Sequence, residues 1–267
     1  MLMVAIKEFT KRRTSIEELF SFVGEIDCLM SIASLRAGLD KFCIPNITEN
    51  NKRILATNLY HPLISDCIEN NIEVDENSIL LTGSNMSGKT SFIRTIGINA
   101  LISYSLNTCF AETFSIPLMK IYSAIRISDD LMNDRSYYFE EVLTIKEMIT
   151  ATLSEDSNLF LLDEIFKVTN TIERISAGKA VLSALAKKNN LAFVSTHDIE
   201  LADLLKDEYD LFHFSENVSE KSVDFDYKLK AGKLRNRNAI KILQINGYPN
   251  NVFDEALKIS VNLDKNS

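Results

Sequence analysis

A glycine-bearing loop between an apolar segment and a helical segment constrains this chain more than any other feature. Residues 83–90 fit the pattern GxxxxGK[ST]. The apolar run at 78–82 predicts a strand before the loop, and residues 89–106 predict a helix after it. Glycines let successive backbone N–H groups turn inward around a polyphosphate, and the N-terminus of the next helix favours anions. The sequence therefore predicts a strand–loop–helix unit that cradles a nucleotide polyphosphate.

We expect this loop and the start of the following helix to hold the phosphates of a nucleotide. Lys89 would reach the β- and γ-phosphates, and the Thr90 hydroxyl would ligate Mg²⁺. The expected nucleotide-binding residues are Gly83, Ser84, Asn85, Met86, Ser87, Gly88, Lys89, Thr90 and Ser91.

A second apolar segment, at 159–162, ends in two acidic residues. A buried strand there would present Asp163 at its C-terminal edge, where ligands bind in open α/β sheets. Asp163 is the second candidate ligand of Mg²⁺, directly or through water. Glu164 follows it and could accept a proton from an attacking water, so it is the candidate general base.

A third apolar run, at 191–195, leads to a histidine at position 197. Histidine at a strand end can sense a γ-phosphate through its imidazole, so we predict that His197 belongs to the catalytic site. The other two histidines fit this chemistry poorly. His61 precedes a proline and suggests a turn, and His213 lies in an apolar alternation and suggests a structural role.

Strand and helix patterns alternate through the middle of the chain, which predicts an α/β fold with a mostly parallel sheet covered on both faces. Besides the segments above, residues 119–127 are expected as a strand and residues 212–229 as an edge hairpin. Further helices are expected at 136–153 and 172–187.

Helical patterns flank this region on both sides. Apolar residues recur at three- and four-residue spacings over 15–41, and Ser15 with Glu18 fits a capping box. Two short helices are expected at 239–245 and 250–261. We therefore predict an N-terminal helical segment at 1–47, a phosphate-loop domain at 48–235 and a C-terminal helical element at 236–267.

Composition limits the partners of the chain. Its 29 Lys and Arg against 37 Asp and Glu give a net charge of −8, whereas a generic nucleic-acid binder is basic. Any DNA contact is therefore expected from a local patch or from regions outside this chain. No uninterrupted apolar run reaches about 18 residues and no signal peptide is evident. With four widely spaced cysteines, these features predict a cytoplasmic protein with reduced thiols and no membrane contact.

Taken together, these motifs resemble the C-terminal ATPase domain of the MutS family of DNA mismatch-repair ATPases. The loop at 83–90, called the phosphate loop below, resembles the family's TGPNMGGKS when Thr82 is included. Its Asn85-Met86 pair is specific to that family among phosphate-loop proteins. Residues 163–171 resemble DEIGRGTST, and more closely the DEIFKGTNT variant of MutS-like proteins. The remaining similarities are those of residues 130–140 to DDL…S-x-F-x-x-E, 195–201 to ATHYFEL, 61–62 to HP, 25–27 to ELD late in the lever helices, and 238–258 to the closing helix-turn-helix.

This resemblance implies an ABC-type ATPase whose active sites are completed by a second subunit. Ser136 falls on the serine that caps the γ-phosphate bound by the partner. Thr169, Asn170 and Thr171 fall on the loop that crosses the dimer interface, and the closing helix-turn-helix dimerises. We therefore expect a homodimer, or a pair with a related subunit, that hydrolyses ATP for mismatch repair or a related DNA transaction.

Several positions depart from the family pattern. Val168 replaces a glycine, which disfavours a left-handed loop conformation there, and Tyr137-Tyr138 enlarges the segment after Ser136. The Phe-x-Glu motif that reads mismatches in the family has no counterpart here. The triplet at 253–255 fits the pattern, but it lies in the expected terminal helices and is interpreted as a chance match. Ile72 is a weak candidate for the residue that stacks on adenine. These departures keep open an alternative, a nucleotide-gated dimerisation module with little turnover.

Other phosphate-loop classes fit less well. A transporter-type ATPase would carry an LSGGQ-like signature and a glutamine loop, and neither is present. A small-molecule or nucleotide kinase would need an arginine-rich lid, and the nearest pair, Arg235 and Arg237, lies beside the terminal helices.

Overall fold

The computed structural model describes residues 8–49, 52–84, 86–125, 137–167, 170–218, 223–234, 245 and 247–264. The chain divides into two compact units, Met1–Phe42 and Cys43–Ser267. The expected boundary after residue 47 falls inside a short strand, β1 (Asn46–Thr48), which pairs with a strand of the second unit.

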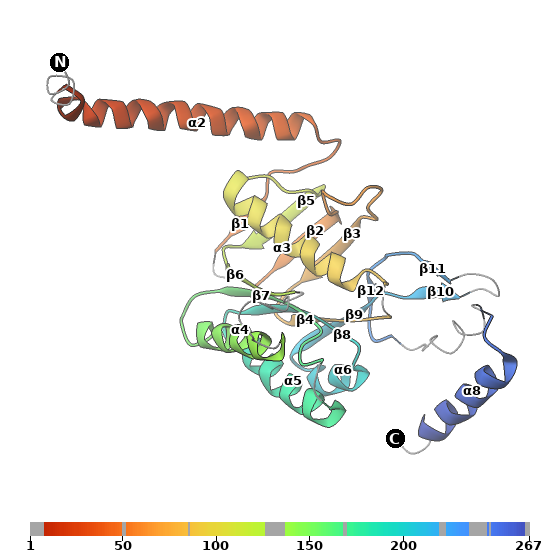
Figure 1. Cartoon of the computed structure of the whole chain (residues 1–267). Coiled ribbons are helices and arrows are strands. Elements are labelled where there is room, and N and C mark those ends of the chain that lie inside the picture. The colour runs from red at the N-terminus through yellow and green to blue at the C-terminus, as the bar shows by residue number, and fades with distance from the viewer. Residues whose placement is uncertain are drawn as a thin grey trace. The chain divides into compact units, whose positions relative to one another are not determined.

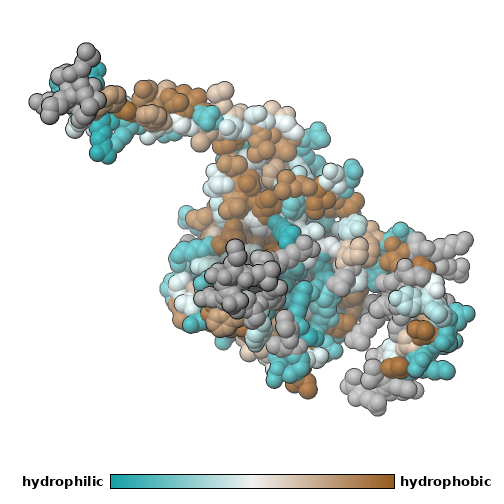
Figure 2. Space-filling model, in the orientation of Figure 1, coloured by the Kyte–Doolittle hydropathy of each residue, from teal (hydrophilic) through white to brown (hydrophobic). Residues whose placement is uncertain are grey.

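The described part of the first unit is dominated by one long helix, α2 (Arg13–Ala37), as the three- and four-residue spacing predicts. The predicted capping box is wrong: the N-cap is Arg12, no side chain caps the helix, and Ser15 lies within it. None of its residues is buried, and Phe20 and Leu29 are 75% and 66% exposed. Hydrophobic side chains lie along α2 in Figure 2.

The second unit is built on a six-stranded sheet in the order β12-β9-β4-β8-β7-β6. All neighbouring strands are parallel except the edge pair of β12 and β9, which confirms the predicted α/β class and the mostly parallel sheet. The strands are β4 (Ser78–Thr82), β6 (Lys120–Ala124), β7 (Asn158–Asp163), β8 (Leu191–Thr196), β9 (Tyr209–His213) and β12 (Lys230–Ala231).

Helices cover both faces of this sheet (Figure 1). One face carries α3 (Lys89–Leu106), and the other carries α4 (Tyr137–Ala151), α5 (Thr171–Leu185) and α6 (Ile199–Leu205). Side chains of β4 alternate between the two faces: Ile79 joins the core around α3, and Leu80 joins the core around the other three helices. Burial on both faces explains why the central strands are continuously apolar.

A second sheet, which the sequence patterns did not reveal, covers the opposite side of α3. Its order is β1-β5-β2-β3, with antiparallel pairing except between β1 and β5. Its longer strands are β2 (Ile54–Leu59), β3 (Asn70–Val74) and β5 (Thr113–Pro117). Their buried side chains share one core with α3, so α3 is held between two sheets, which fixes its N-terminus.

A hairpin is present within 212–229, as β10 (Glu216–Val218) and β11 (Val223–Phe225), but it forms a separate two-stranded sheet and not the edge of the large one. The last expected helix corresponds to α8 (Asn250–Asp264), whereas the helix expected at 239–245 lies almost wholly outside the described residues. Across the part of the chain that the structure describes, no helix is long and apolar enough to cross a membrane.

Candidate functional site

The phosphate loop joins the end of β4 to the start of α3, as the sequence predicts, and two of its glycines are required by geometry. Gly83 has a φ of 152°, and a Cβ there would lie 2.7 Å from the Phe214 carbonyl oxygen and 2.8 Å from Ser87 Oγ. Gly88, with a φ of 107°, is the N-cap residue of α3. A side chain at either position would strain the turn that points the loop toward the helix N-terminus.

Lys89 lies inside this loop. Its Nζ donates hydrogen bonds to the carbonyl oxygens of Gly83, at 2.9 Å, and Ser84, at 2.8 Å, and its side chain is buried. Burial lowers the pKa of Lys89, while the nearby carboxylates of Glu164 and Asp163 act in the opposite direction. The loop therefore holds one cation close to two acidic groups.

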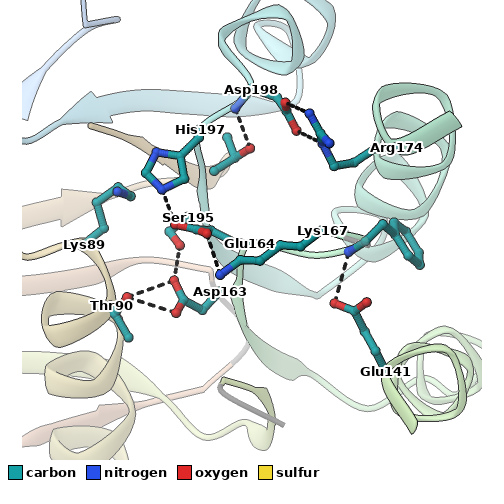
Figure 3. Close-up of polar contacts among 12 residues, drawn as sticks. Lys89, Thr90, Glu141, Asp163, Glu164, Lys167, Arg174, Ser195, His197 and Asp198 are labelled. Atoms are coloured by element: carbon teal, nitrogen blue, oxygen red, sulfur yellow. Dashed lines mark hydrogen bonds and ion pairs between the residues drawn. The ribbon is translucent and has the colours of Figure 1, made fainter. Parts of the chain in front are cut away.

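Thr90 and Asp163, the two predicted Mg²⁺ ligands, meet below the loop (Figure 3). Thr90 Oγ1 lies 2.9 and 3.0 Å from the two carboxylate oxygens of Asp163. Ser195 lies opposite Asp163 in the ladder between β7 and β8, and its hydroxyl donates to Asp163 Oδ1. These hydroxyl and carboxylate oxygens are the kind of ligand that Mg²⁺ prefers.

Glu164 and His197 also contact each other, so the residues that directly follow β7 and β8 meet at this edge of the sheet. His197 Nε2 pairs with Glu164 Oε1, and Lys167 Nζ lies 2.5 Å from Glu164 Oε2. Burial by itself would raise the pKa of Glu164, but hydrogen bonds from His197 and Lys167 outweigh it and lower the pKa to about 2. Glu164 is therefore an ionised carboxylate with a partner on each oxygen.

Two further polar contacts, which sequence reasoning missed, surround this pair (Figure 3). Glu141 on α4 accepts a hydrogen bond from the backbone N–H of Phe166 at 3.0 Å. Arg174 on α5 forms a two-point ion pair with Asp198, the residue after His197. One signal was available for the first contact: in S-x-F-x-x-E counted from Ser136, the final glutamate falls at position 141.

A cavity of about 540 Å³ opens beside the phosphate loop, within the size range of small-molecule sites. Its lining includes Lys89, Thr90, Glu164, the apolar side chain of Ile64 and the ring of Tyr227. Sequence reasoning missed Tyr227, which follows the hairpin strand β11. Ile72, the weak adenine candidate, is buried in β3 and does not line the cavity.

The other predicted residues fall into two groups: some lie outside the described residues, and some have other contacts. Asn85, Ser136, Val168 and Thr169 lie outside the described residues. Asn170 Oδ1 accepts a hydrogen bond from the backbone N–H of Glu173 and so caps α5, which begins at Thr171. His213 contacts the Gly232 carbonyl oxygen, in keeping with a structural role.

The family model of MutS domain V matches residues 79–264 of the chain. The chain is also similar to proteins named DNA mismatch repair protein MutS. The protein of Petrotoga mobilis is 28% identical over 264 residues, which cover 91% of this chain and 31% of the relative. The Aquifex pyrophilus protein is 26% identical over 269 residues, which cover 97% of this chain and 31% of the relative. The chain thus spans less than one third of each of these relatives.

Proposed function

This chain belongs to the MutS domain V family, and from that premise we propose that it binds ATP with Mg²⁺ beside the phosphate loop and hydrolyses it. The observation that carries the proposal is the meeting of Thr90 and Asp163. These residues come from separate elements, α3 and β7, yet their oxygens lie within 3.0 Å of each other. Lys89 lies beside them, at the helix N-terminus where polyphosphates bind in such folds.

The residues at this point fit a magnesium ion. Mg²⁺ is usually held by one or two carboxylates together with the substrate phosphates. Asp163 would supply the carboxylate and Thr90 the hydroxyl, and Ser195 would orient Asp163 through its hydrogen bond. When bound, the ion would neutralise charge that develops on the phosphates.

Glu164 is the proposed general base. Its carboxylate is ionised, so it can take a proton from a water directed at the γ-phosphate. His197 holds one oxygen of that carboxylate in place, and Lys167 engages the other. Both contacts favour the ionised form, so release of either one would raise the pKa of Glu164 and make it a stronger base. Lys167, whose side chain is 49% exposed, is the more exposed of the two partners, since that of His197 is 38% exposed.

We further propose that a second subunit completes the site and that hydrolysis serves DNA mismatch repair or a related DNA transaction. The support is membership in the MutS domain V family and the names of the relatives. In this proposal Ser136 of one subunit contacts the γ-phosphate held by Lys89 of the other. Sequence outside this chain would supply most of the DNA contact, because the chain carries a net charge of −8.

Isothermal titration with ATP and Mg²⁺ tests the binding site. Lys89→Ala should abolish detectable binding, because it removes a charge-assisted phosphate contact. Lys206→Ala, which removes an exposed lysine at the end of α6, is the matched control and should bind as wild type. Unchanged affinity in Lys89→Ala would refute the assignment of the phosphate loop.

Mixing two impaired variants tests the composite site. Ser136→Ala should bind ATP and hydrolyse it slowly, and Lys89→Ala should not bind it. In a mixed dimer, one site combines an intact Lys89 with the partner's intact Ser136, so activity should return at that site. If the mixture stays inactive while both variants remain folded and dimeric, Ser136 does not act on a partner's nucleotide.

The engagement of both Glu164 oxygens favours a second candidate, a module that dimerises on ATP binding with little turnover. The two functions differ in single-turnover hydrolysis. An ATPase with a composite site should show specific activity that rises with protein concentration. A gated dimerisation module would instead show ATP-dependent dimers in analytical ultracentrifugation and almost no phosphate release.

A further inference from the structure

The segment that carries the proposed base has a strained backbone. Glu164 has a φ of 54° and Phe166 a φ of 59°, so two non-glycine residues out of three adopt the left-handed conformation. Side chains disfavour this conformation because Cβ approaches the following carbonyl oxygen. Such residues persist only where the surroundings hold them, and they cluster at functional sites.

Two hydrogen bonds hold the strained backbone in place. The N–H of Glu164 donates to the carbonyl oxygen of Ser195 at 3.0 Å, which ties the segment to β8. The N–H of Phe166 donates to Glu141 Oε1, also at 3.0 Å, and this acceptor belongs to a side chain of α4. The first bond is part of the backbone and the second depends on one residue type, so only the second can be removed by substitution.

The surroundings of Glu141 disfavour a carboxylate. It is only 2% exposed, and its Oε2 is buried without a hydrogen-bond partner in the part of the chain that the structure describes. Burial raises the pKa of Glu141, against the effects of the Phe166 N–H and of Lys167. A buried acceptor without a partner destabilises a fold, so packing alone does not explain a carboxylate at this position.

We propose that Glu141 is a positioning residue for Glu164: by accepting the Phe166 N–H, it keeps the left-handed turn that aims the Glu164 carboxylate at the γ-phosphate. The inference rests on the proposed ATPase function. It gives α4 a direct connection to the base, since Glu141 lies in the first turns of that helix and Phe166 lies two residues beyond Glu164.

Three variants separate positioning from simple stability. Glu141→Gln keeps a carbonyl oxygen that can accept the Phe166 N–H, whereas Glu141→Leu fills the space without an acceptor. Glu147→Leu is the matched control, because it changes an exposed glutamate on the same helix. For each variant, the ATP affinity, the single-turnover hydrolysis rate, the melting temperature and the hydrogen exchange of the peptide covering 164–167 are measured.

We expect Glu141→Leu to lower the hydrolysis rate about 10- to 100-fold, the cost of misplacing a catalytic group by about 1 Å, with ATP affinity within about threefold of wild type. Amide exchange at 164–167 should accelerate in the same variant. Glu141→Gln should show a hydrolysis rate and a protection of the 164–167 amides from exchange close to those of wild type. The Glu147→Leu control should match wild type in every measurement.

Three results would overturn the inference. The first is a wild-type rate with wild-type exchange in Glu141→Leu. The second is a Glu141→Gln variant as slow as Glu141→Leu, which would assign the effect to charge rather than to the acceptor. The third is a loss of rate, affinity and melting temperature in parallel. If wild type itself releases no phosphate, the ATPase function fails, whereas hydrogen exchange still tests whether Glu141 holds the turn.

Discussion

The ion pair between Arg174 and Asp198 connects α5 to the residue that follows His197. Arg174 Nε lies 2.8 Å from Asp198 Oδ2, and one of its terminal nitrogens lies 2.7 Å from Oδ1. The two side chains are 23% and 15% exposed. Removing the pair should release the backbone next to His197 and lower the stability of the domain.

The expected magnitude follows from this geometry and burial. Exposed ion pairs contribute at most about 1 kcal/mol, and breaking a fully buried pair costs about 3–5 kcal/mol. A mostly buried pair with two charge-assisted hydrogen bonds lies between these limits, so we expect a coupling energy of about 2 kcal/mol. The pair of Lys179 with Glu208 also involves α5, is more exposed at 32% and 34%, and should couple by less than about 1 kcal/mol.

The assay is a double-mutant cycle by urea unfolding. Arg174→Ala, Asp198→Ala and the double variant give the coupling energy, and the same cycle on Lys179 and Glu208 is the control. The Asp198 side chain makes no capping hydrogen bond to α6, so its removal adds no capping loss to the cycle. A coupling no larger than that of the control pair would refute the reasoning from burial and two-point geometry.

Four further predictions concern the site and its charge. Glu164→Gln should keep ATP binding and lower turnover about 10²- to 10⁴-fold, the usual contribution of a general base; a wild-type rate in a phosphate-release assay would contradict the role. Asp163→Asn should shift the midpoint of a Mg²⁺ titration of ATPase activity upward more than it changes nucleotide affinity, and an unchanged midpoint would count against a metal ligand at this position. The pKa of Glu164 is lowered to about 2, so its ionised form stabilises the fold at neutral pH. That contribution should disappear as the pH falls from about 4.5 through about 2. Urea unfolding at several pH values would then show a shrinking difference in the free energy of unfolding between wild type and Glu164→Gln. The chain alone should bind duplex DNA weakly even at about 50 mM salt, and submicromolar, salt-sensitive binding in fluorescence anisotropy would reveal a basic patch.

Local sequence determined the centre of this protein. An apolar strand, a glycine-bearing loop and a helix follow one another at 78–106, and the structure places them as β4, the loop and α3. The acidic residues and the histidine that follow two other apolar strands come together because parallel strands end at one edge of the sheet. Which of these residues meet, Thr90 with Asp163 and Glu164 with His197, also depends on the order β4-β8-β7, which the folded sheet sets.

Tertiary structure decided the features that depend on contacts between distant segments. The sheet formed by β1, β2, β3 and β5 has short strands, and β5 pairs with two strands that lie far back in the chain, so the sequence patterns did not reveal it. The expected capping box at Ser15 failed because α2 begins upstream of it.

The residues around the proposed base show most clearly which contacts the sequence patterns could not predict. In the sequence, Glu141 is the last glutamate of an S-x-F-x-x-E pattern without an assigned role, and Tyr227 lies within the expected edge hairpin at 212–229. Only the packing of α4 under the 164–167 turn gives Glu141 its buried contact with Phe166, and only the path of the chain after β11 brings Tyr227 to the cavity. A motif specifies chemistry through adjacent residues, whereas burial and hydrogen-bond partners arise from segments that meet only after folding.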